Sequence, residues 1–147
     1  MELILIKETL EENDELLKNP VCFEIVHMTI EFYKKVGFLP PWVGYFARQN
    51  NDLVGSAGFK GPPIKGRVEI AYGTFEEYRK RGIGTAICKL LIDVSLKKDP
   101  SIKITARTIS EENFSTRVLQ NNNFRLIGTV MDPEDGEVWE WLYAVED

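Results

Sequence analysis

The chain has 147 residues, 44% of them hydrophobic, and its 23 acidic and 18 basic side chains give a formal net charge of −5. This length and composition predict one globular domain over residues 1–147 and exclude a disordered chain. The acidic balance, with Lys and Arg not massed on one helix or tail, disfavours nucleic acid as a partner. Cys22 and Cys88 form no C-x-x-C or Cys/His cluster, so neither a metal site nor a disulfide scaffold is indicated.

The apolar segments of the chain are too short for a membrane span. Residues 1–6 carry an acidic second residue and too few apolar positions for a secretory signal. We therefore expect a cytoplasmic protein without a membrane partner.

Hydrophobic periodicity predicts the elements of the first half of the chain. A short strand over 3–7 is followed by a charged helical turn within 9–18, and strands over 42–48 and 53–59 form a hairpin around the turn at 49–52. Between the helical turn and the hairpin, a helix is predicted over 21–36, ending at Gly37. Its expected core face consists of Val21, Ile25, Met28, Phe32 and Val36.

The same helix carries His27, the single histidine of the chain. Its ordinary pKa of about 6.5 suits proton transfer near neutral pH, which makes it a candidate general base. The sequence supplies no partner for it, so a packing role is the favoured interpretation.

In the second half, a strand over 68–75 precedes a helix that begins near Ile83 and ends at 97–100. A strand over 102–107 follows, and a strand, helix and strand in succession predict a right-handed crossover and a parallel pair. Ser110 is the expected N-cap of a last helix that runs to about Asn122. Strands over 124–130 and 138–145 complete an α+β fold with helices packed on one mixed sheet.

A basic turn with two glycines, Arg79-Lys80-Arg81-Gly82-Ile83-Gly84, joins the fourth strand to its helix. The first turn of a helix has unpaired N–H groups and partial positive charge, and such a turn binds phosphate. The spacing fits neither G-x-x-x-x-G-K-[ST] nor G-x-G-x-x-G, but it does fit R-x-x-G-x-G. A tight turn with solvated basic side chains is the structural alternative.

In this setting the turn resembles the acyl-CoA diphosphate loop of the GNAT acetyltransferase superfamily. The segment 112–124, ENFSTRVLQNNNF, is similar to the E-N-x-x-S-x-x-V-L-x-x-x-G-F signature of the branch that includes ribosomal-protein N-terminal acetyltransferases. Trp42, Gly58-Phe59 and residues 53–55 and 68–72 follow that branch as well, so the resemblance covers residues 42–143. It implies a three-layer α/β/α fold with a mixed, mostly antiparallel sheet of six to seven strands, a splayed parallel central pair and four helices.

Three departures from the signature affect the expected site. The span from Asn113 to Phe124 is one residue shorter than in the family, and Asn123 replaces the usual glycine. Leu119 stands where many relatives have a tyrosine that acts as general acid. A leucine donates no proton, which leaves Ser115, a bound water, Tyr72 or Tyr143 as candidates for that role.

The resemblance implies an N-acetyltransferase that uses acetyl-CoA, without a metal, to acetylate a primary amine by direct attack through a tetrahedral intermediate. The sequence does not indicate whether the acceptor is a small molecule or a protein N-terminus. It also does not indicate whether the protein is a monomer or a homodimer. The expected coenzyme-binding residues are Tyr72, Gly73, Thr74, Phe75, Arg79, Lys80, Arg81, Gly82, Ile83, Gly84, Thr85 and Asn113. A bulge at Gly73-Thr74 is expected to turn a backbone N–H toward the thioester carbonyl.

The expected catalytic residues are Glu69 as general base and Ser115 as donor to the leaving thiolate. Glu69 faces away from its strand neighbours and matches a position where several superfamily members have glutamate, although a salt-bridge role is nearly as well supported. Trp139 and Trp141 are expected in the core rather than in an acceptor pocket. The alternative function is a catalytically weak or inactive acyl-CoA-binding regulatory module.

Overall fold

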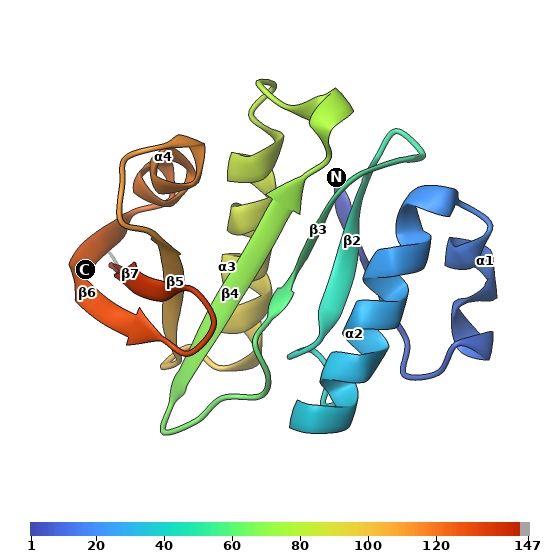
Figure 1. The fold of residues 1–147 in the computed structure, drawn as a ribbon, viewed down its shortest axis with the longest axis horizontal. Helices are drawn as coiled ribbons and strands as arrows, with labels where there is room; N and C mark the ends of the chain where they lie inside the picture. Colours follow the sequence, from blue (N-terminus) through green and yellow to red (C-terminus); the bar gives the residue numbers. More distant parts are fainter. Residues whose placement is uncertain (145–147) are drawn as a thin grey trace.

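A computed structural model describes residues 1–144 as a seven-stranded sheet with helices on both faces (Figure 1). The strand order is β1-β2-β3-β4-β5-β7-β6, and every neighbouring pair is antiparallel except the parallel pair β4–β5. This is the mixed α+β sheet that the sequence predicts. The strands are β1 (Glu2–Leu5), β2 (Gly44–Gln49), β3 (Asp52–Phe59), β4 (Arg67–Thr74), β5 (Lys103–Ile109), β6 (Phe124–Asp132) and β7 (Gly136–Tyr143).

In the described residues, four α-helices and three 3₁₀ turns connect the strands. The helices are α1 (Asp14–Leu17), α2 (Phe23–Val36), α3 (Ile83–Lys98) and α4 (Phe114–Asn121), and the 3₁₀ turns are η1 (Glu11–Asn13), η2 (Pro20–Cys22) and η3 (Glu76–Tyr78). No helix among residues 1–144 is long and apolar enough to cross a membrane. The predicted end of the last strand at Val145 lies outside the described residues.

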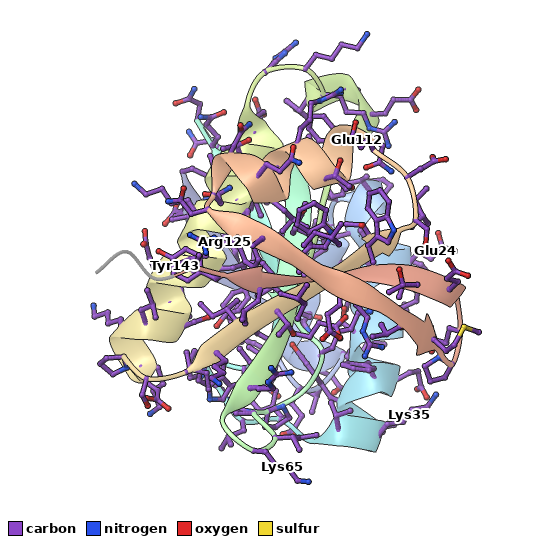
Figure 2. All side chains as sticks on the ribbon, turned by 90° about the vertical axis from the view of Figure 1, so that its left-hand side faces the viewer. Glu24, Lys35, Lys65, Glu112, Arg125 and Tyr143 are labelled. Carbon is purple, nitrogen blue, oxygen red and sulfur yellow. The ribbon has the colours of Figure 1, made fainter. Side chains whose placement is uncertain are left out.

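The alternation of side chains along β2 divides the core into two layers. Phe46 packs with Cys22 and Val26 on the face covered by α2, whereas its neighbours Tyr45 and Ala47 belong to the larger cluster that includes α3. Successive residues of a strand point to opposite faces, so one strand supplies both layers. Figure 2 views the molecule from the β6 edge of the sheet, with α4 above the β6–β7 hairpin.

The predicted core face of α2 is wrong at Met28 and Phe32, although Ile25 does pack against the core. Met28 is 66% and Phe32 is 37% exposed, whereas Val26 and Tyr33 are buried. The helix begins at Phe23, after a 3₁₀ turn, rather than at residue 21. Its rotation about its own axis therefore differs from the one that apolar spacing alone favours.

A hydroxyl group accounts for this rotation. Tyr33 donates a hydrogen bond to the Ile6 carbonyl at 2.8 Å and accepts one from the Gly44 N–H at 2.8 Å, which satisfies one backbone group just after β1 and one at the start of β2. Burial raises the pKa of Tyr33 to about 12, so the hydroxyl keeps its proton. A Cβ on Gly44 would lie 2.8 Å from Cγ2 of Thr29, so the glycine allows α2 to pack this closely.

The start of α4 also differs from the prediction. Its N-cap is Asn113 rather than Ser110: the Asn113 side-chain oxygen accepts from the Thr116 N–H at 3.1 Å, and the Thr116 hydroxyl accepts from the Asn113 N–H at 2.9 Å. Ser110 instead donates to the Glu137 carbonyl on β7 at 3.2 Å. A reciprocal cap satisfies two backbone N–H groups that have no partner within the helix, so it stabilises the helix start more than a single hydroxyl would. Asn123 has φ +65°, the left-handed conformation expected after the helix.

The expected bulge at Gly73-Thr74 is absent, because the β3–β4 register runs without a shift from Gly55–Thr74 to Phe59–Ile70. The opening beside β4 has another origin. The parallel ladder joins only Arg67–Glu69 to Lys103–Thr105, and beyond it β5 diverges from β4. A twisted sheet thus splays at its centre.

Candidate active site

Three adjoining cavities extend across the splay between β4 and β5. The large cavity, of about 600 Å³, lies between α2, β4 and the β6–β7 turn. The middle cavity, of about 330 Å³, lies between β4 and β5, and the loop cavity, of about 440 Å³, lies between the end of β4, the basic turn and α4. Tyr72 lines all three, so its side chain stands where they meet.

The loop cavity brings together residues from three separate parts of the chain. Of the sequence-predicted residues it is lined by Tyr72, Gly73, Thr74, Arg79, Lys80, Asn113 and Ser115. Two further lining residues, Phe114 and Arg117, were missed by sequence reasoning. Arg117 lies two positions after Ser115, and the family signature leaves its position unspecified. The cavity is therefore rimmed by three cationic side chains.

The basic turn takes the backbone conformation that glycine favours. Lys80 and Gly82 have φ +65° and +74°, both left-handed, and the space around Gly82 is open. The first helical bond of α3 runs from the Ala86 N–H to the Gly82 carbonyl at 3.2 Å. The N–H groups of residues 83–85 precede this bond, and helix geometry leaves them without intrahelical partners.

The other predicted coenzyme residues do not line the loop cavity with their side chains. Phe75 packs near Phe46, with ring centroids 6.4 Å apart, and Ile83 is buried in the core. Arg81 lies over the Tyr78 ring at 5.8 Å, and the carbonyl of Thr85 accepts a hydrogen bond from the Asn122 side chain at 3.1 Å.

Gly84 serves the packing of two helices. A Cβ at this position would lie 3.2 Å from the Phe114 ring and 3.2 Å from Cγ2 of Val118. The missing side chain therefore allows α3 and α4 to approach each other. The sequence interpretation, that this glycine gives a ligand access to the backbone, is not needed to explain it.

The free edge of β4 faces the middle cavity. Phe75 donates its N–H to the Val54 carbonyl on β3 at 2.9 Å. Hydrogen bonding alternates along an antiparallel ladder, so the backbone groups of Tyr72 and Thr74 point to the side of β5. Since β5 has diverged there, this edge is open to an extended ligand. The Thr74 hydroxyl is buried and has no hydrogen-bond partner among residues 1–144.

Tyr72 connects the free strand edge to α4. Its hydroxyl donates to the Ser115 carbonyl at 3.1 Å. Burial raises the pKa of Tyr72 far above its ordinary value, so the phenol stays protonated.

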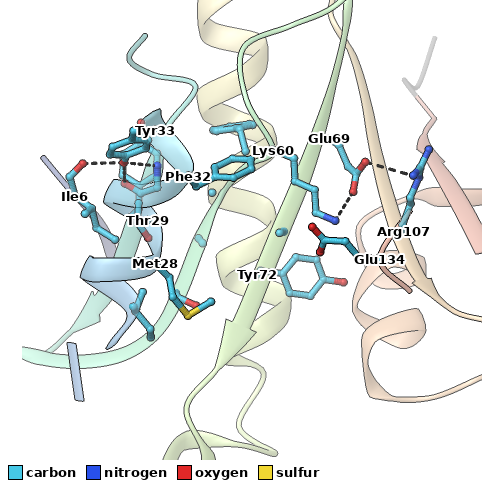
Figure 3. A pocket seen from close by; sticks show the side chains of 18 of the residues that line it. Ile6, Met28, Thr29, Phe32, Tyr33, Lys60, Glu69, Tyr72, Arg107 and Glu134 are labelled. Carbon is cyan, nitrogen blue, oxygen red and sulfur yellow. Dashed lines mark hydrogen bonds and ion pairs between the residues drawn. The ribbon is translucent and has the colours of Figure 1, made fainter. Parts of the chain in front are cut away.

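Glu69 lies in the large cavity between two cations (Figure 3). Lys60 Nζ is 2.9 Å from its Oε2, and Arg107 Nε is 3.7 Å from its Oε1. The Lys60 contact is an ion pair outside hydrogen-bonding angles, so within residues 1–144 Oε2 has no hydrogen-bond donor. Arg107 also pairs with Asp132 at 3.0 Å and with Glu140 at 3.3 Å.

The remaining sequence candidates lie outside the three cavities. Leu119 is fully buried in the core, and the Tyr143 ring packs beside Phe124 at 5.6 Å. His27 packs on Phe23 at 4.4 Å, and the cavity linings do not include it. Trp141 is buried and donates to the Thr108 hydroxyl at 3.0 Å, in agreement with the core interpretation.

A mixed sheet that splays beside its parallel pair, with a basic turn opening a helix at the splay, defines an acetyltransferase fold of the GNAT type. The chain belongs to the acetyltransferase (GNAT) family, whose model matches residues 12–124. Among residues 1–144 no group of three or more His, Cys, Asp or Glu is placed to hold a metal ion.

Similar proteins support this assignment. An uncharacterized N-acetyltransferase of Bacillus subtilis, YjdG, is 26% identical over 100 residues, which are 67% of this chain and 56% of that protein. The apo structure of RimL, a ribosomal L7/L12 alpha-N-protein acetyltransferase, has a TM-score of 0.69 at 18% identity and covers 95% of this chain and 90% of its own. The aminoglycoside acetyltransferase AAC(6')-Ib in complex with coenzyme A has a TM-score of 0.66 at 17% identity, covering 96% and 94%. At such identities these structures establish the fold alone.

Proposed function

We propose that this protein is an acetyl-CoA-dependent N-acetyltransferase that acetylates a primary amine of a small molecule or a protein N-terminus by direct attack. The observation that carries the proposal is the row of three adjoining cavities, with the basic turn at one end and Glu69 at the other. Such a row accommodates a long phosphorylated donor and a separate acceptor that meet at Tyr72.

The loop cavity fits coenzyme A in charge and in hydrogen bonding. Arg79, Lys80 and Arg117 line it, and the N–H groups at the start of α3 add partial positive charge beside it. The buried Thr74 hydroxyl, which has no hydrogen-bond partner in the described part of the chain, and the open β4 edge suit the amide-bearing pantetheine arm. When bound, the coenzyme supplies an activated acetyl thioester.

Glu69 and Ser115 are the residues proposed to move protons. An ammonium is not a nucleophile, so the Glu69 carboxylate takes a proton from the acceptor nitrogen before attack. The Ser115 side chain donates a proton toward the leaving sulfur, and its position in the lining of both the middle and the loop cavity supports this role. Tyr72 bonds to the Ser115 carbonyl at 3.1 Å and so holds the first turn of α4 against β4.

Coenzyme binding and turnover are tested together by calorimetry with coenzyme A and by thiol release from acetyl-CoA with a panel of amines and peptides. The double variant Arg79→Ala/Lys80→Ala is expected to weaken coenzyme A binding at least about tenfold, because charge-assisted contacts to phosphate are lost. The control is Lys97→Ala/Lys98→Ala, which removes two exposed lysines at the far end of α3. Equal affinities in both double variants would refute the binding site.

A second candidate function is an acyl-CoA-binding regulatory module without turnover. The regulatory module is favoured by Leu119, which is buried and stands where many relatives have a tyrosine that acts as general acid. Tight coenzyme binding without thiol release for any amine would support this module and contradict the acetyltransferase.

A further inference from the structure

Helix α2 carries two apolar faces, and the core uses only one of them. Val26 and Tyr33 are buried and Ile25 packs against the core at the border of the two faces, whereas Met28 and Phe32 line the large cavity. Met28 and Phe32 remain 66% and 37% exposed. Neighbouring apolar side chains that line an open cavity mark a surface for binding an apolar group.

The opposite side of the large cavity is charged, and its charges nearly cancel. Its carboxylates belong to Glu69, Asp132 and Glu134, and its cations to Lys60 and Arg107. Glu69 pairs with Lys60 at 2.9 Å and Asp132 with Arg107 at 3.0 Å. Within residues 1–144 Glu134 makes no ion pair, and Figure 3 shows it among the side chains around the cavity. Counted over the lining side chains alone, three carboxylates face two cations, which leaves an excess of one negative charge, and Glu140 outside the lining shares Arg107 with them.

We infer that the acceptor is a primary amine with a single positive charge and an apolar or aromatic group a few bonds from the nitrogen. This inference rests on the proposed function and specifies its substrate class. The ammonium group lies on the side of Glu69 and Glu134, and the apolar group lies against Met28 and Phe32. Among the residues that line the cavity in the described part of the chain, a polycation finds no second carboxylate without an ion pair, and burying its extra charges without partners is unfavourable.

Two sources share this chemistry. One is a free alkylamine or arylalkylamine, and the other is the amino terminus of a peptide whose first side chain is large and apolar. A cavity of about 600 Å³ is large enough for either.

The test is thiol release from acetyl-CoA by the wild-type protein with phenethylamine, isoamylamine, peptides that begin with Phe or Ser, spermidine and kanamycin. The kcat/KM values for phenethylamine, isoamylamine and the Phe peptide are expected to be at least about tenfold higher than those for spermidine, kanamycin and the Ser peptide. The faster member of the pair phenethylamine and Phe peptide identifies the source.

Two matched variants test the apolar wall itself. Phe32→Ser is expected to raise KM for the apolar amine roughly tenfold, because a large apolar contact is lost, and to leave KM for acetyl-CoA unchanged. Phe23→Ser is the control, since Phe23 is a 58% exposed aromatic residue of the same helix that lies outside the cavity lining. Met28→Ser, at a more exposed position, repeats the test if Phe32→Ser folds poorly.

The outcomes separate this inference from the proposed function. Preferred acetylation of spermidine or kanamycin, or unchanged apolar-amine KM in Phe32→Ser and Met28→Ser, would overturn the inference and leave the acetyltransferase standing. Absence of thiol release with every amine would overturn both.

Discussion

At the scale of single residues, two cationic neighbours of Glu69 determine the position of its carboxylate. Lys60 and Arg107 hold the carboxylate in place from two sides, at 2.9 and 3.7 Å. These partners fix its direction toward the large cavity, and they also compete with an incoming ammonium for its oxygens. The salt-bridge role, which the sequence presents as the alternative, is thus observed, and it is compatible with the catalytic role that we propose for the same side chain.

Replacing Glu69 by Gln keeps its size and removes its charge and basicity. We expect kcat/KM for the amine to fall about 100-fold, as for loss of a general base, with unchanged acetyl-CoA affinity. Steady-state kinetics and calorimetry measure the two quantities.

Glu140→Gln is the matched control. Glu140 also pairs with Arg107, at 3.3 Å, and is similarly buried, but the cavity linings do not include it. Equal losses in the two variants would mean that Glu69 acts only through its ion pairs.

At the scale of elements, Gly84 limits how closely α3 and α4 pack. In Gly84→Leu the new side chain meets Phe114 and Val118, whose nearest atoms are 3.2 Å from the Cβ position. Overpacking of this kind is expected to lower the free energy of unfolding by about 1–3 kcal/mol, measured by urea denaturation.

The partly exposed Phe114 ring supplies the control for this prediction. In the double variant Gly84→Leu/Phe114→Ala the contact with the ring is removed while Val118 remains, so part of the loss should be recovered. If no stability is recovered, the cost of Gly84→Leu does not come from the Phe114 ring.

The sheet, the helices and the basic turn were predictable because periodicity and turn chemistry are local signals. The rotation of α2 was not predictable, since it depends on Tyr33 bonding to Ile6 and Gly44, which are distant in sequence. The start of α4 was misplaced because Ser110 and Asn113 are both good caps and only the second forms a reciprocal pair. Half of the expected coenzyme residues line the loop cavity; Gly84 instead depends on packing between helices, which no single segment encodes.

At the scale of the whole molecule, Arg107 ties the two halves of the sheet together. From β5 it reaches Glu69 on β4, Glu140 on β7 and Asp132 at the end of β6. Hydrogen bonds from the Glu134 N–H, Arg107 and the Asp135 N–H lower the pKa of Asp132 to about 2. The β6–β7 turn and the wall of the large cavity are thus held by one ionised carboxylate.

This pKa predicts how stability depends on pH. The folded-state pKa is depressed, so Asp132 stabilises the fold above its ordinary pKa of 3.8, and that contribution is lost as the pH falls to about 2. Asp132→Asn should be less stable than wild type at pH 7 and should show a shallower decline between these two pH values, measured by urea midpoints.

Asp135→Asn alters a carboxylate of the same turn that makes no ion pair within residues 1–144 and serves as the control. Its decline between those pH values should match the wild type. A wild-type decline in Asp132→Asn would show that other groups cause the acid sensitivity.

The shared position of Tyr72 has a consequence for side reactions. Its ring stands between the cavities assigned to donor and acceptor, and it is the side chain that all three have in common. A smaller residue there would merge them into one channel through which water reaches the thioester as easily as an amine. Under the proposed function, the ratio of acyl transfer to hydrolysis then depends on this one phenol ring.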